Sequence, residues 1–166
     1  MKKEQKFSLS QLLEFFPEIE LPITLAEDDH HTFSQNNKAL PKLMIEQYFV
    51  PLEKTAPDDF TEYIPCFRIP ETGNFTAIVY WKASLMTYEY ILLTFDKKGK
   101  IIDKKTIAGT KAEGQALARS VATITEDWEI YMVGGVVSAN DDSYDPANSQ
   151  SVCLELLPTG EIVVTN

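Results

Sequence analysis

The chain has 166 residues, which is enough for one domain with a hydrophobic core and too few for two domains of ordinary size. Hydrophobic residues make up 44% and charged residues 24%, so the composition excludes a disordered chain and a coiled coil. Lys and Arg number 15 against 25 Asp and Glu, giving a net charge of −10, which repels phosphate backbones and excludes nucleic acid as an expected partner. An acidic surface suits solubility or the binding of a basic protein.

The N-terminus and the cysteines indicate the compartment. Residues 1–6 are basic, but Gln11 and Glu14 interrupt the apolar stretch that a removable export signal requires. No apolar run approaches the ~20 residues of a membrane span, so we expect a cytoplasmic protein without membrane insertion, unless a leader has been removed. Cys66 and Cys153 form no local pair for a disulfide or zinc site and are predicted to be buried free thiols.

The first predicted helix lies close to the N-terminus. Residues 8–11 have the pattern of a capping box, and an apolar stripe at helical spacing follows until Pro17 ends the helix. The stripe consists of Leu9, Leu12, Leu13 and Phe16. Residues 17–26 then alternate apolar and polar side chains between prolines, which predicts an edge strand or an extended segment. Packing of this helix on the protein's own sheet is favoured over docking to a membrane or partner, because it has no basic face.

A second helix is predicted after a polar loop at residues 27–38. It begins at Pro41, a position that the first turn tolerates, and ends at Pro51. Its side chains are apolar nearly all round, so the helix is predicted to be well buried. Residues 52–66 are acidic and contain prolines, which is typical of a connection within a domain.

The remainder of the chain reads as short strands separated by turns. Two turns around Gly99 and Gly160 follow the same order of apolar strand, glycine-containing reversal and apolar strand, which is the pattern of a β-hairpin. Gly134 and Gly135 indicate a bulge or a close backbone approach. Residues 110–120 are ambiguous and could contain a helical turn. Strands are predicted at residues 66–69, 75–83, 88–95, 100–107, 121–125, 128–137, 150–157 and 161–165.

The predicted fold class is α+β. We expect an antiparallel β-meander of about seven to eight strands, forming a curved sheet or partly closed barrel covered by two short N-terminal helices. The cover is required because residues 75–81 and 88–95 carry large side chains on both faces. Residues 1–166 are predicted to form a single domain, with a helical cap at 1–51, a connection at 52–66 and the sheet at 67–166.

A loose resemblance to other proteins is carried by two segments. The first leads from Phe16-Pro17 to Leu21-Pro22-Ile23, and the second runs from Tyr90 to Asp103 through the Gly99 turn. Together they resemble a group of small bacterial strand-rich proteins of no assigned activity. The resemblance implies a fold and no catalytic residue.

Aromatic side chains on neighbouring strands form one candidate site. If the sheet curls, these rings could line a hollow for an apolar or sugar-like ligand, although strands also use aromatic residues for ordinary cross-strand packing. Packing is the favoured interpretation. The candidate ligand-binding residues are Tyr80, Trp81, Tyr88, Tyr90, Trp128 and Tyr131, with Phe75 beside them.

Two polar segments provide the other candidate sites. Asp28, Asp29, His30 and His31 combine carboxylates with imidazoles, the ligands of a metal site or general base, but adjacent side chains in an extended loop point apart. A solvated loop is therefore favoured there. Residues 140–148 resemble a calcium loop without its required glycine and terminal carboxylate, so we favour a polar hairpin tip. Its candidate partner-binding residues are Asp141, Asp142, Tyr144 and Asp145.

No residue pattern in the sequence assigns a function. The chain lacks a GxSxG elbow, a phosphate-binding glycine loop and an HExxH motif, which lowers the odds of an enzyme, and no cofactor is expected. The favoured hypothesis is a non-catalytic interaction module that binds a protein partner, in the manner of an immunity protein. The alternative is a small-ligand carrier or sensor with an aromatic-lined hollow. A metal-assisted enzyme built on residues 28–31 is the third hypothesis.

Overall fold

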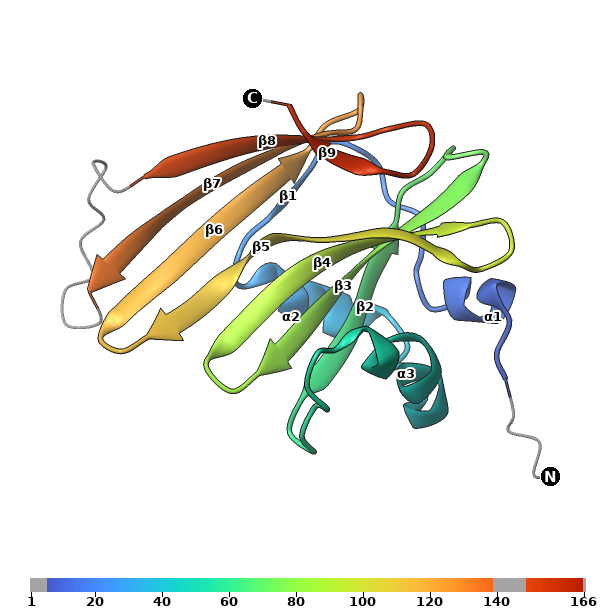
Figure 1. The fold of residues 1–166 in the computed structure, drawn as a ribbon, viewed down its shortest axis with the longest axis horizontal. Helices are drawn as coiled ribbons and strands as arrows, with labels where there is room; N and C mark the ends of the chain where they lie inside the picture. Colours follow the sequence, from blue (N-terminus) through green and yellow to red (C-terminus); the bar gives the residue numbers. More distant parts are fainter. Residues whose placement is uncertain (1–5, 139–148, 166) are drawn as a thin grey trace.

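The computed structural model describes residues 6–138 and 149–165, and nearly half of them lie in β-strands (Figure 1). The strands are β1 (Ile23–Leu25), β2 (Glu62–Arg68), β3 (Phe75–Ser84), β4 (Thr87–Asp96), β5 (Ile101–Glu113), β6 (Ala116–Ile124), β7 (Glu129–Ser138), β8 (Gln150–Leu156) and β9 (Ile162–Val164). The helices are α1 (Leu9–Leu13), α2 (Asp29–Asn36), α3 (Lys42–Tyr48) and the 3₁₀ turn η1 (Val50–Leu52). Within these described ranges, no helix has the length and apolar character needed to cross a membrane.

The strands form one antiparallel sheet. Its order is β2-β3-β4-β5-β6-β7-β8-β9, so each strand after β2 pairs with the next one along the chain, as the predicted meander requires. The eight predicted strands are confirmed as β2 to β9, with different ends. The sheet is not closed, because β2 and β9 lie at opposite ends of the order and no pairing between described strands joins them, so the predicted alternative of a partly closed barrel is not confirmed.

The sheet divides between β5 and β6. Residues 109–113 of β5 pair with residues 116–120 of β6, but the remaining half of β6 pairs with β1 instead. The hydroxyl groups of Thr24 and Thr123 meet across this junction at 2.9 Å. The strand predicted within residues 17–26 is therefore confirmed at 23–25, and it extends the sheet along the half of β6 that β5 leaves free.

Two hydrophobic clusters lie on opposite faces of β3 and β4. Ile78 and Tyr80 belong to a cluster with α1 and α3, whereas Val79 and Trp81 belong to a cluster with β1 and β6 to β9. This alternation follows from the two-residue period of a strand. It explains why the sequence places large side chains on both faces, because helices cover one face and the far half of the sheet covers the other.

The first helix has the predicted cap. The Ser8 hydroxyl accepts from the Gln11 backbone N–H at 3.2 Å, and the Gln11 side chain accepts from the Ser8 N–H at 2.7 Å. Leu12 and Phe16 are fully buried against the sheet. The helix ends earlier than predicted, at Leu13.

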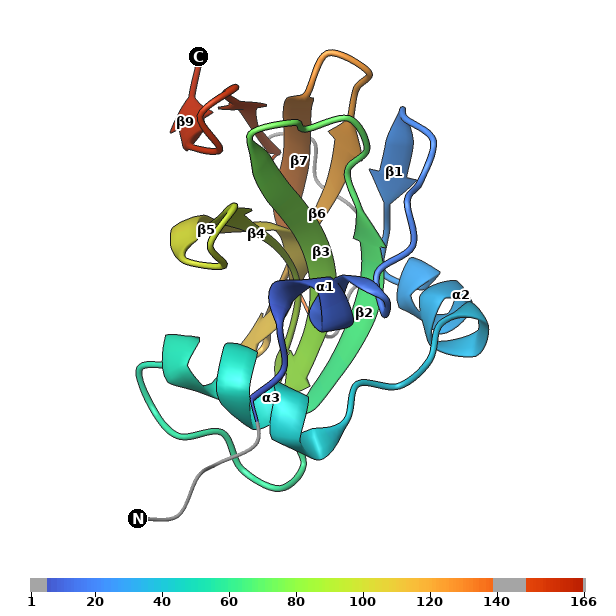
Figure 2. The same ribbon diagram turned by 90° about the vertical axis from the view of Figure 1, so that its right-hand side faces the viewer.

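The helical cover differs from the prediction in two respects. The described residues contain three α-helices, because α2 occupies the segment predicted to be a loop. Figure 2 shows α2 and α3 on opposite sides of β2 and β3. The rings of Phe33 in α2 and Phe67 in β2 have centroids 5.7 Å apart, and this contact anchors α2 to the sheet. The prediction that the second helix is well buried is also wrong. A helix resting on one face exposes its opposite side, and Met44 is buried in α3 while Leu43 is 54% exposed.

Three hairpins share the same five-residue turn. In each, the first residue donates its backbone N–H to the carbonyl of the fifth at 2.7 to 2.9 Å. The fourth residue has positive φ in every case: +86° at Gly99, +92° at Gly160 and +67° at Trp128. The two glycine turns were predicted, because glycine adopts this conformation without a steric cost. Trp128 adopts it while packing edge-on against Phe75 at 5.7 Å.

Two further local predictions can be compared with the fold. Residues 110–120 form the β5–β6 hairpin around Gly114, so a helical turn there is wrong. The register between β6 and β7 is continuous through Gly134, which excludes a bulge in that pairing, but the alternative of a close approach is confirmed. A Cβ on Gly134 would lie 3.0 Å from the carbonyl oxygen of Arg119. Cys66 and Cys153 are free, as predicted, but only Cys66 is buried, and the predicted burial of Cys153 is wrong because this side chain is partly exposed.

Candidate functional site

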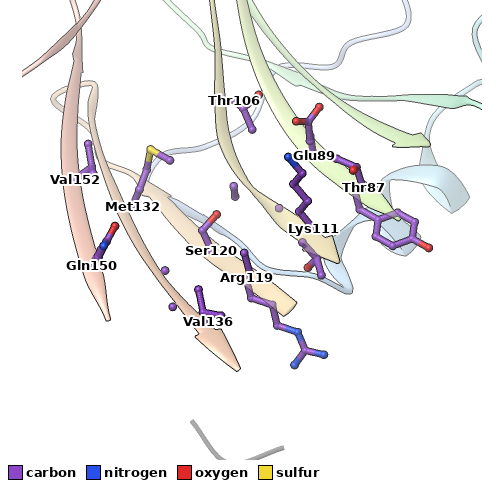
Figure 3. Close-up of a pocket in the computed structure, with 17 residues that line it drawn as sticks. Thr87, Glu89, Thr106, Lys111, Arg119, Ser120, Met132, Val136, Gln150 and Val152 are labelled. Carbon is purple, nitrogen blue, oxygen red and sulfur yellow. The ribbon is translucent and has the colours of Figure 1, made fainter. Parts of the chain in front are cut away.

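Three cavities meet at Tyr88, near the start of β4. The largest, here called the groove cavity, has a volume of about 400 Å³ and lies between the β4–β5 hairpin and strands β6 to β8 (Figure 3). Thr87, Glu89 and Lys111 form one wall, and Met132 and Val152 form the other. Its lining is mainly apolar with a few charged groups, which is the composition of small-molecule sites.

The second cavity has a volume of about 300 Å³ and adjoins the first, with which it shares residues of β4, β5 and β6. We call it the aromatic cavity. It lies where the segment leading into α2 crosses the sheet. Its lining residues are Glu27, Asp28, His30, Trp81, Tyr88, Tyr90, Gly109, Thr110 and Ser120.

The third cavity, here called the rim cavity, has a volume of about 380 Å³ and lies at the β3–β4 turn. Two of its apolar residues are almost fully exposed, Phe60 at 88% and Leu85 at 84%. Large apolar side chains exposed beside a hollow are typical of a binding surface. The rim cavity is lined by Asp58, Phe60, Glu62, Trp81, Ala83, Ser84, Leu85 and Tyr88.

A stack of rings separates these cavities from the core. His30 stacks on Trp81 with ring centroids 4.0 Å apart and planes 1° apart, and Tyr88 stacks on Trp81 at 5.8 Å and 7°. The strand register creates the second contact, because Trp81 pairs with Tyr90 and Ala83 with Tyr88, which puts all four on one face. Trp81 is 6% exposed, whereas Tyr88 is 42% exposed and offers its ring to the cavities.

One hydrogen bond joins the crossing segment to the sheet, and a second contact closes a turn within the segment. The Tyr90 hydroxyl donates to the Ala26 carbonyl at 2.8 Å, and the His30 Nδ1 lies 2.7 Å from the Glu27 carbonyl. Burial, as the largest cause, raises the pKa of Tyr90, so this hydroxyl stays protonated and remains a donor. The bond from Tyr90 therefore attaches the backbone beside the aromatic cavity to β4.

The backbone of β5 comes unusually close to β4 at Gly109. A Cβ at this position would lie 2.2 Å from the carbonyl oxygen of Tyr88, so the strands can approach only because residue 109 has no side chain. Gly109 lines both the groove cavity and the aromatic cavity.

The charged groups of the aromatic cavity are carboxylates. The Glu27 Oε2 lies 3.8 Å from the Arg119 Nε. Both side chains are about half exposed, so the attraction between them is weak. Asp28 is the N-cap residue of α2, yet its carboxylate makes no capping hydrogen bond to the helix. The Asp28 side chain therefore lines the cavity without the local partner that an N-cap aspartate ordinarily has.

The structure brings three of the six predicted ligand-binding aromatics together. Trp81, Tyr88 and Tyr90 line the aromatic cavity. Tyr80 points to the opposite face and is fully buried in the cluster with α1 and α3. Trp128 packs on the core, and Tyr131 is 46% exposed on β7, lining none of the three cavities. Ordinary packing therefore accounts for Tyr80 and Trp128, whereas Tyr131 lies on the exposed surface of the sheet.

The predicted metal ligands do not converge. The Asp29 carboxylate accepts from the Ala26 N–H at 2.7 Å, and His31 packs on the ring of His30 at 4.0 Å. Residues 6–138 and 149–165 contain no group of three or more histidine, cysteine or acidic side chains that could hold a metal ion. Asp28 and His30 lie instead at the aromatic cavity.

The Tyr80 hydroxyl is buried without a hydrogen-bond partner in the described part of the chain. A buried unpaired polar group costs stability, so we expect Tyr80→Phe to leave the free energy of unfolding unchanged or raise it by about 1 kcal/mol. The matched control is Tyr90→Phe, which removes a paired hydroxyl and is expected to cost about 1 kcal/mol. Urea unfolding measures both. A loss at Tyr80 as large as that at Tyr90 would contradict the prediction.

Several residues of the site were not identified from the sequence. Glu27, Thr110 and Ser120 belong to segments predicted as a loop and an ambiguous turn, and Gly109 lies between the strand predicted at 100–107 and that ambiguous segment. The predicted partner-binding residues Asp141, Asp142, Tyr144 and Asp145 lie outside the described residues.

Comparisons with known proteins do not assign the chain to a family. No family model matches the sequence, and no curated protein or solved structure shows significant similarity to it. The resemblance to bacterial strand-rich proteins therefore stays a prediction. The hollow around Tyr88 is the feature of the structure that bears on function.

Proposed function

We propose that the protein is a non-catalytic binding protein that takes a small ring-bearing ligand in the hollow around Tyr88. The observation that carries this proposal is the position of Tyr88, which lines all three cavities with a half-exposed ring. An aromatic ring held by Trp81 offers a large contact area at little entropic cost, because its orientation is already fixed by stacking.

The size and composition of the hollow support a small ligand. The groove and aromatic cavities, at about 400 and 300 Å³, each fall within the range of small-molecule sites. Ala108, Met132 and Val152 supply apolar surface, and Thr110 and Ser120 supply hydroxyl groups that can orient a bound molecule. A carrier or sensor uses such a site, since it requires a shaped hollow and no reacting side chain.

Binding of N-phenyl-1-naphthylamine, a neutral dye that fluoresces in apolar sites, tests the proposal. We expect a fluorescence increase that saturates, and about tenfold weaker binding in Tyr88→Ala, because the contact area of the ring is lost. Tyr131→Ala is the matched control, since Tyr131 is similarly exposed on the same sheet but lines none of the three cavities. Equal affinity of the two variants, or no saturable binding, would contradict the proposal.

A protein partner at the rim cavity is the second candidate. Phe60 and Leu85 are the observation in its favour, because side chains exposed by more than four-fifths gain most from being covered. The acidic net charge is compatible with a basic partner. If a protein partner displaced bound N-phenyl-1-naphthylamine, we would conclude that a segment of that partner occupies the hollow.

A further inference from the structure

We infer that the aromatic cavity selects ligands that carry a positive charge beside an aromatic ring, such as an aryl-alkyl amine. This inference rests on the proposed function, because it names the class of ligand for the same hollow. The charged side chains among the lining residues are Glu27 and Asp28, and the lining includes no Lys or Arg. A ligand that enters here therefore meets carboxylates and aromatic rings together.

The arrangement separates the two parts of such a ligand. Glu27 and Asp28 are exposed, whereas Trp81 and Tyr90 are 6% and 1% exposed. A ring would rest against Tyr88 and the edge of Trp81, where apolar area is removed from water, while an ammonium group would remain near the carboxylates. Two effects favour a cation at this place. The carboxylates attract it directly, and the negative face of an aromatic ring attracts it through a cation–π interaction.

Asp28 is the residue with the largest expected contribution to charge selection. Glu27 already has Arg119 at 3.8 Å, so part of its charge is offset. The Asp28 carboxylate makes no capping bond, and a ligand cation would supply the missing partner. Anionic ligands meet repulsion from both carboxylates and from the net charge of −10, which opposes their approach.

The groove cavity does not share this preference. Glu89, Lys111 and Arg119 line it, so both signs of charge are present on its walls. A ligand without charge is therefore compatible with the groove cavity, whereas the aromatic cavity discriminates. Because of this difference, an experiment can contradict the charge preference of the aromatic cavity without contradicting the existence of a binding hollow.

Three indoles of similar size form the test: tryptamine as the cation, indole-3-acetamide as the neutral form and indole-3-acetate as the anion. Each is titrated into the full chain by calorimetry and against bound N-phenyl-1-naphthylamine. We expect tryptamine to bind about tenfold more tightly than the amide, and the acetate more weakly than the amide. Asp28→Asn is expected to weaken tryptamine about fivefold and leave the amide unchanged.

The control variant is Asp127→Asn, which removes the same charge from an exposed acid that lines none of the three cavities. It is expected to change tryptamine affinity by less than about twofold. Equal binding of the three indoles, lost in Tyr88→Ala, would overturn the charge inference and leave the proposed function standing. Tryptamine binding unaffected by Asp28→Asn, or no binding of any indole while the dye still binds, would also overturn the inference. Failure of the dye itself would overturn both.

Discussion

Lys82→Met is expected to lower the free energy of unfolding by about 3 kcal/mol, because it leaves a carboxylate unpaired in a mostly buried site. Lys82 Nζ lies 2.6 Å from Glu53 Oε2, and the two side chains are 16% and 13% exposed. Glu53 also accepts from the Tyr63 hydroxyl at 3.1 Å. The bond to Glu53 fastens the connection before β2 to the face of β3, so unfolding in urea measures the attachment of this segment.

The double variant Glu53→Gln/Lys82→Met separates loss of pairing from loss of packing. Removing both charges is expected to recover more than half of the stability, since the buried charge is gone and the amide oxygen introduced at position 53 can still accept from Tyr63. Glu18→Gln is the exposed control: it breaks the 3.6 Å pair with Arg68, whose side chain is 37% exposed, and should cost less than about 1 kcal/mol. Additive single and double effects would mean that the two charges do not interact.

Gly109→Ala is expected to cost about 2 to 4 kcal/mol and to abolish dye binding in the hollow. The new Cβ would lie 2.2 Å from the Tyr88 carbonyl oxygen and 3.1 Å from the Glu89 Cα, and these backbone atoms cannot move aside as a flexible side chain can. Relief of the overlap requires β4 and β5 to separate where Gly109 lines two cavities. Urea unfolding measures the first effect and dye titration the second.

Gly73→Ala supplies the matched control for a glycine replacement. Gly73 has φ of +68° and no atom within 4 Å of the added Cβ, so only the conformational strain of about 1 kcal/mol is expected. Dye binding should be unchanged, because residue 73 lines none of the three cavities. Equal destabilisation by the two replacements would contradict this prediction, because it would show that β4 and β5 can move apart at Gly109 with little loss of stability.

The fold was predictable where its determinants are local. The turns at Gly99 and Gly160 need positive φ at their fourth residue, and glycine there between apolar strands is visible in the sequence. The equivalent turn at Trp128 carries no such residue, and its strand pairing was predicted from the flanking apolar residues alone. Helix α2 was missed because Phe33 is its main apolar anchor, which leaves no stripe for a periodicity argument.

The candidate site was only half predictable, because its parts come together through tertiary packing. Asp28 and His30 were only candidate metal ligands in a segment for which a solvated loop was favoured. Trp81 and Tyr88 belonged to a separate hypothesis, as candidate ligand-binding rings for which ordinary packing was favoured. The stacking of His30 on Trp81 at 4.0 Å joins the two sets, and it depends on α2 crossing the sheet. The two-residue period of a β-strand predicts which aromatic side chains share a face of the sheet. It does not predict which distant segment of the chain covers that face.

The pairing of β1 with β6 has a consequence for how the chain reaches its native state. Thr24 and Thr123 are 99 residues apart in sequence yet share a hydrogen bond. Bringing together such distant segments costs loop entropy, whereas each hairpin after β2 closes over a few residues. We therefore expect the hairpins to assemble before β1 docks, and Glu27, Asp28 and His30 follow β1 in the chain. The aromatic cavity, which these three residues line, is then expected to form later than the hairpins.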